Sequence, residues 1–147
     1  TATPATRDLA QELVRDLGGT VFWVDEDRRT LYHAGLAHGA NHLVTLVSQA
    51  MDLLRASGSD DPAATLSPLL TAALDNALSY GDAALTGPIV RGDVETVRAH
   101  LADIAVTAPA TLDSYVAMAR ATADRAVAAE AAKAAIASAR TAGSSRS

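Results

Sequence analysis

The chain has 147 residues, with 12 basic against 17 acidic side chains and a net charge of −5. Hydrophobic residues make up 49% of it, aromatic residues only 3%, and cysteine is absent. The chain therefore lacks the basic stripe that nucleic-acid binding requires, and it has no thiol for a disulfide, a zinc site or a nucleophile. Its apolar runs stop well short of the roughly 18 residues that span a bilayer, and no signal peptide opens the chain. We expect a cytoplasmic protein that binds neither nucleic acid nor membranes.

Helices are predicted for most of the chain, because alanine makes up about a quarter of it and is the best helix former. The first helix should begin at the N-cap Thr3 and stop at the glycine pair 18–19. Residues 20–24 (TVFWV) are β-branched and aromatic and predict one short strand. A single strand needs a partner, so this segment would pair with another chain or with residues upstream of Thr1, or it is not a strand; we favour a partner upstream of Thr1. The absence of an initiator methionine agrees with a fragment or a processed chain.

Residues 31–56 predict a long helix with two distinct faces. The apolar face comprises Leu36, Ala40, Leu43, Val47, Ala50, Met51 and Leu54. The polar face comprises His33, His38, Asn41, His42, Thr45, Ser48, Gln49 and Asp52. Gly35 and Gly39 lie four residues apart near the apolar face, where the missing side chains would let another helix approach closely.

Three more helices are predicted beyond this point. Asp61 caps a helix over residues 62–80, Asp93 caps the next one, and Pro109 starts the last. The fold class is all-α, with five to six helices in a bundle and one orphan strand near the N-terminus. Residues 138–147 are expected to form a disordered tail.

The histidines offer one candidate metal pair. His38 and His42 have the four-residue spacing that places two imidazoles on one helix face, where they could hold zinc. Gly39 follows His38 where a metalloprotease has glutamate, and no third ligand is indicated, so a solvated polar face is favoured and we expect no metal. His100 is interpreted as a surface residue.

The polar face of the long helix is the first candidate site. Asn41 lies two turns after His33, and Thr45 continues the same side. Imidazole, amide and hydroxyl groups in one line can bind a polar substrate and exchange protons with it. The alternative is that this polar face only contacts water.

The loop over residues 86–93 is the second candidate site. It combines Thr86, the exposed backbone of Gly87, the guanidinium of Arg91 and the carboxylate of Asp93. Such a loop could bind an anionic substrate. The same residue types also make an ordinary corner between two helices, so spacing alone leaves both readings open.

Three segments carry a family resemblance: residues 32–44 (YHAGLAHGANHLV), 84–93 (ALTGPIVRGD) and 97–101 (VRAHL). Together they resemble the C-terminal helical domain, catalogued as a domain of unknown function, of bacterial Rossmann-like NAD(P)-dependent oxidoreductases. These enzymes are distantly related to ketopantoate reductase and 6-phosphogluconate dehydrogenase. The resemblance covers about residues 18–128 and implies the helical fold of the 6-phosphogluconate dehydrogenase C-terminal domain.

The resemblance also implies a domain organisation and a function. Residues 1–30 would be the last helix and strand of a missing dinucleotide-binding domain, and residues 31–137 the helical substrate-binding and dimerisation domain. NADP or NAD would be bound in the full-length protein and not by this fragment, which would be inactive alone. The expected partners are a second copy of the chain, in a homodimer, and a small 2-oxo or 2-hydroxy acid as substrate.

The resemblance implies catalytic roles for two residues, and five further residues of the two candidate sites are predicted to bind substrate. Asn41 would orient the substrate and His33 would supply the proton, while Arg91 would pair with a carboxylate. The other predicted substrate-binding residues are Thr45, Thr86, Gly87 and Asp93. The relatives carry a catalytic lysine one turn before the asparagine, and here that position is Ala37. The alternative function is a non-enzymatic helical dimerisation or interaction module.

Overall fold

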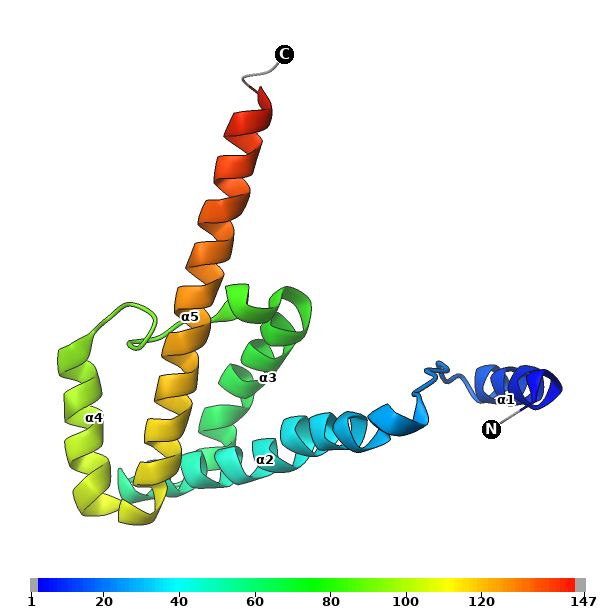
Figure 1. Ribbon diagram of the computed structural model, residues 1–147. Coiled ribbons are helices and arrows are strands. Elements are labelled where there is room, and N and C mark those ends of the chain that lie inside the picture. Colours follow the sequence, from blue (N-terminus) through cyan, green and yellow to red (C-terminus); the bar gives the residue numbers. More distant parts are fainter. Residues whose placement is uncertain (1–2, 145–147) are drawn as a thin grey trace. The chain divides into compact units, whose positions relative to one another are not determined.

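The computed structural model describes the backbone of residues 3–144 and the side chains of residues 3–131 (Figure 1). Within this described part the chain forms α-helices and short 3-10 helices and no strand, which confirms the predicted all-α fold. The elements are α1 (Pro4–Asp16), η1 (Glu26–Arg28), α2 (Arg29–Ala56), α3 (Pro62–Tyr80), η2 (Gly81–Ala84), α4 (Val94–Thr107) and α5 (Pro109–Ser144). None of the helices in the described residues is both long and apolar enough to cross a membrane.

The chain divides into two compact units, residues 1–45 and residues 46–147. The boundary lies within α2, so this helix contributes its first half to one unit and its last turns to the other. The predicted helices over residues 31–56 and 62–80 are confirmed, with α2 starting two residues earlier at Arg29.

In the first unit, α1 begins and ends where the sequence predicts. The side chain of Thr3 accepts a hydrogen bond from the amide of Thr6 at 3.3 Å, which caps the first turn. At the other end Gly18 has a φ of 74°, a conformation that favours glycine. The Gly19 amide donates to the carbonyl oxygen of Val14 at 2.8 Å. A Cβ at Gly19 would lie 2.8 Å from Cγ1 of Val14, so this close turn requires glycine.

The predicted strand over residues 20–24 is wrong. This segment is neither helix nor strand, because none of the described residues offers it a second strand with which to exchange backbone hydrogen bonds. Ring contacts are made instead: the Arg7 guanidinium lies 5.2 Å from the Trp23 ring centroid, and the rings of Phe22 and Tyr32 are 6.0 Å apart. The β-branched and aromatic composition thus reflects side-chain contacts rather than a sheet.

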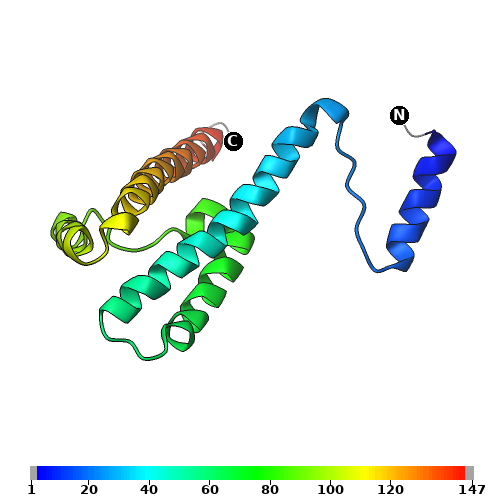
Figure 2. The same cartoon turned by 90° about the horizontal axis from the view of Figure 1, so that it is seen from below.

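In the second unit, capping carboxylates start two of the helices. Oδ1 of Asp61 accepts from the Ala64 amide at 3.0 Å at the beginning of α3, and Asp93 caps α4. α4 and α5 form a hairpin and lie side by side (Figures 1 and 2). α5 is also tied to η2, because Nη1 of Arg125 donates to Oδ1 of Asp82 at 2.6 Å.

The C-terminal part of α5 enters the region predicted to be a disordered tail. The helical backbone runs to Ser144, and residues 145–147 lie outside the described part of the chain.

Burial is sparse throughout residues 3–131. Only Pro62 and Ile104 are buried among them, the latter with 6% of its surface exposed. Large apolar side chains remain exposed in both units; those at least 65% exposed are Leu9, Leu17, Phe22, Leu31, Val44, Leu69, Leu78, Tyr80, Val106 and Val127. A domain of this size normally buries a contiguous core, whereas these helices leave large apolar side chains exposed in both units.

Candidate functional site

The predicted site residues on the polar face of α2 lie in the part of this helix that belongs to the first unit. His33, Asn41 and Thr45 are all exposed on this helix. His33 borders a hollow of about 670 Å³ that also contacts the rings of Phe22 and Tyr32. Asn41 and Thr45 lie farther along the helix, outside the lining of this hollow.

An ion pair forms another wall of the same hollow. Nη1 of Arg29 donates to Oε1 of Glu26 at 3.1 Å, and both side chains line the hollow with His33. The structure therefore places His33 beside a guanidinium, a carboxylate and two aromatic rings, all supplied by residues 22–33. Such a set of groups can bind a polar molecule next to an imidazole that exchanges protons.

The other two histidines of α2 contact each other. The Nδ1 atoms of His38 and His42 are 2.9 Å apart, and the rings meet edge to face with centroids 5.0 Å apart. One ring must donate and the other accept for this hydrogen bond to form. In the part of the chain that the structure describes, no three His, Cys, Asp or Glu residues group together in a way that could hold a metal ion.

The predicted substrate-binding loop before α4 is held by its own backbone. The amides of Arg91, Gly92 and Asp93 all donate to carbonyl oxygens of the same loop, at 2.9 to 3.2 Å. Gly87 and Gly92 have φ values of 98° and 67°, which the loop requires and which glycine readily adopts. These three amides are used internally and are not available to an anion, whereas the guanidinium of Arg91 is exposed.

Asp93 has a structural role in this loop. Its carboxylate accepts hydrogen bonds from the amide of Thr96 at 3.1 Å and from the Thr96 hydroxyl at 2.7 Å. These hydrogen bonds are the main reason that the pKa of Asp93 lies below its usual value, and the positive charge of Arg91 adds to the effect. Asp93 is thus an ionised cap of α4.

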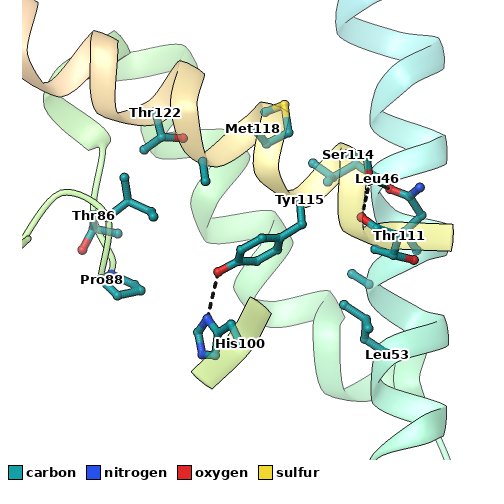
Figure 3. Close-up of a pocket in the computed structure, with 14 residues that line it drawn as sticks. Leu46, Leu53, Thr86, Pro88, His100, Thr111, Ser114, Tyr115, Met118 and Thr122 are labelled. Atoms are coloured by element: carbon teal, nitrogen blue, oxygen red, sulfur yellow. Dashed lines mark hydrogen bonds between the residues drawn. The ribbon is translucent and has the colours of Figure 1, made fainter. Parts of the chain in front are cut away.

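A second hollow, of about 410 Å³, lies within the second unit (Figure 3). The last turns of α2, the loop before α4, α4 itself and α5 all contribute to it. Of the predicted site residues, Thr86 lines this hollow, whereas Gly87, Arg91 and Asp93 do not. Most of its surface is apolar, with Leu53 from α2 and Met118 from α5 among its walls.

Two hydrogen-bonded pairs interrupt the apolar lining. Nδ1 of His100, on α4, lies 2.8 Å from the hydroxyl of Tyr115, on α5, with the two rings edge to face (Figure 3). Burial raises the pKa of the Tyr115 hydroxyl. The hydroxyl of Ser114 donates to Oε1 of Gln49 at 2.8 Å, which links α5 to the polar face of α2. The first pair joins the consecutive helices α4 and α5, and the second joins residues that are 65 positions apart in the sequence.

The sequence analysis did not identify these pairs. His100 is exposed, as expected of a surface residue, but its partner lies 15 residues away on another helix. Gln49 belongs to the predicted polar face of α2, and the structure shows that this part of the face contacts α5 rather than water alone. Tyr115 is half-buried in the last helix, where periodicity indicates packing and gives no sign of a polar partner.

Comparison with known proteins identifies the domain type. No curated protein and no solved structure matches the chain. One family matches over residues 1–122, which is most of the chain, and it is described as Domain of unknown function (DUF2520). The chain belongs to this DUF2520 family.

Proposed function

We propose that the chain is the helical substrate-binding and dimerisation domain of an NAD(P)-dependent oxidoreductase that acts on a small 2-oxo or 2-hydroxy acid. The proposal extends the resemblance carried by residues 32–44 and 84–93 to Rossmann-like oxidoreductases. It is supported by the match to a domain of unknown function, the kind of domain that the resemblance implies. The dinucleotide would be bound by a separate domain, and this chain would complete the site.

The observation that carries the proposal is the near absence of buried side chains within residues 3–131. Only Pro62 and Ile104 are buried there, while leucines on α1, α2 and α3 are exposed. Burying such side chains contributes about 1.5–3 kcal/mol each, so they favour association strongly. Helices of this kind suit a domain that works while covered by a second copy of itself and by a cofactor-binding domain.

The proposed chemistry uses residues on the first half of α2. Asn41 would hydrogen-bond to the substrate and orient it, and His33 would donate a proton to the substrate oxygen as the carbonyl is reduced. The exposed imidazole of His33, beside a hollow of about 670 Å³, fits a proton donor at an open face. A bound reduced nicotinamide would supply the hydride.

The test is reduction of a small 2-oxo acid by the full-length gene product, followed through the absorbance of NADPH. His33→Ala should lower turnover at least a hundredfold, which is within the usual contribution of general acid catalysis, about 10²–10⁴-fold. His42→Ala, on the same helix and equally exposed, is the matched control and should keep the wild-type rate. A wild-type rate in His33→Ala would contradict a catalytic role for His33.

A non-enzymatic helical dimerisation module is the second candidate. It is favoured by Ala37, which stands where the resembling reductases carry their catalytic lysine. The exposed apolar faces fit this function equally well. A full-length protein that dimerises but binds neither NADPH nor NADH would decide for the module and against the oxidoreductase.

A further inference from the structure

The hollow of about 410 Å³ in the second unit has the size and lining of a small-molecule site. Its volume falls in the range of about 300–1,000 Å³ that is usual for ligand pockets. Its walls include Leu46, Ala50 and Leu53 from α2 and Met118 and Ala119 from α5. An apolar ligand body would therefore be in contact with side chains from two helices.

The His100–Tyr115 pair gives this apolar hollow one defined polar function. If the Tyr115 hydroxyl donates to Nδ1, the other ring nitrogen of His100 carries a free N–H. If Nδ1 donates instead, the Tyr115 O–H is free. In both cases the pair has a donor that this hydrogen bond leaves unused, and a ligand with a hydrogen-bond acceptor can bind to it. The raised pKa of Tyr115 agrees with a hydroxyl that keeps its proton.

The residue types that line the hollow also restrict the charge of the ligand. None of the residues that line this hollow is Lys, Arg, Asp or Glu. A charged ligand would lose part of its hydration there and would meet no Lys, Arg, Asp or Glu side chain, which is costly in an apolar site. A neutral acceptor avoids this cost.

We infer that this hollow binds a neutral carbonyl compound with an apolar body, such as an aryl or alkyl ketone or aldehyde, whose oxygen accepts the spare hydrogen bond of the His100–Tyr115 pair. Figure 3 shows Tyr115 extending from α5 toward His100, with Met118 on the same helix. Of the predicted substrate-binding residues only Thr86 lines this hollow, and binding here can be measured without the proposed oxidoreductase activity because this chain supplies all the lining residues and no cofactor is needed.

The two methionines of the chain provide the assay. Met118 lines the hollow, whereas Met51, on α2, does not, so the two methyl groups act as reporter and internal control. The full chain, labelled with ¹³C at the methionine methyls, is titrated with 4-phenylbutan-2-one. We expect a saturable shift of the Met118 signal with a Kd of about 1 mM, as for a ligand of this size, and a constant Met51 signal. The charged analogue 3-phenylpropanoate should bind more weakly.

Variants separate the ligand site from a purely structural hydrogen bond. The double variant His100→Leu/Tyr115→Phe removes both polar groups and should weaken ketone binding about 3- to 10-fold, the usual effect of losing one hydrogen bond. Tyr80→Phe removes a hydroxyl from an exposed tyrosine outside the hollow and should bind as wild type does. An unchanged Met51 signal and unchanged helical circular dichroism show that each variant is folded.

Three outcomes would overturn the inference. The first is the absence of a saturable Met118 shift up to about 10 mM ketone, a concentration well above the expected Kd. The second is equal ketone binding by the folded double variant. The third is a Met118 signal that changes when the ligand-free chain is diluted, because a second copy of the chain would then fill the hollow. NADPH-dependent activity enters none of these measurements, so the site and the proposed function can fail separately.

Discussion

A leucine stripe on α3 gives the most direct test of the proposed dimer. Leu66, Leu70, Leu74 and Leu78 follow one another at four-residue spacing, so they share one side of the helix. The first two are half-buried, whereas Leu74 is 48% exposed and Leu78 is 79% exposed. The stripe thus continues from packed residues onto an uncovered surface, and we expect a second copy of the chain to cover it.

The size of the effect follows from the exposed fractions. The uncovered parts of Leu74 and Leu78 together amount to a little more than one whole leucine side chain. Burial of one leucine contributes about 1.5–3 kcal/mol, and a twofold interface counts each substitution twice. The double variant Leu74→Ser/Leu78→Ser should therefore cost the dimer about 4–8 kcal/mol, which raises its dissociation constant by a factor of about 10³ or more.

Sedimentation equilibrium over a range of concentrations measures this constant. Leu69→Ser is the matched control: Leu69 is 67% exposed on the same helix, but at about 100° per residue it lies about 140° or more around the helix from Leu74 and Leu78. The control should dimerise like the wild type. Equal dissociation constants for the wild type and the double variant would contradict an interface at Leu74 and Leu78. Loss of dimerisation in Leu69→Ser alone would show that the interface lies on the other side of α3.

Three further predictions concern single residues. Asp93→Ala should lower the melting temperature at neutral pH through loss of the α4 cap, with the same helix content. The folded-state pKa of Asp93 is lowered, so its stabilisation is present above its ordinary pKa, near 3.9, and is lost as the pH falls through the lowered value; the difference between wild type and Asp93→Ala should shrink in acid. A constant difference down to strongly acidic pH would contradict this role. The raised pKa of Tyr115 predicts one tyrosine that ionises late in an ultraviolet titration and is missing in Tyr115→Phe. Asn41→Ala in the full-length gene product should reduce turnover by weakening substrate orientation, and an unchanged turnover would count against the proposed site.

Local sequence signals predicted the helices well because they act over a few residues. The caps at Thr3, Asp61 and Asp93 and the positive φ of Gly18 are fixed by side chains or conformations within one turn. A strand depends on a partner that may lie anywhere in the chain, so the composition of residues 20–24 alone was insufficient and the prediction was wrong.

The hollow in the second unit shows why spacing in the sequence does not predict a site formed between helices. His100 and Tyr115 meet because α4 and α5 pack together, and Gln49 meets Ser114 across 65 residues. No spacing rule within one helix links such residues. Thr86 also lines this hollow, and it was predicted as a substrate-binding residue for a local reason: the loop before α4 breaks the helical pattern with two glycines and a proline.

We expect a second copy of the chain to cover the exposed apolar side chains of these helices. Native mass spectrometry of the purified chain at micromolar concentration tests it most directly. We expect a species of twice 15.1 kDa for the wild type and the single-chain mass for the Leu74→Ser/Leu78→Ser variant. A folded wild-type chain that remains at 15.1 kDa over the accessible concentrations would contradict it.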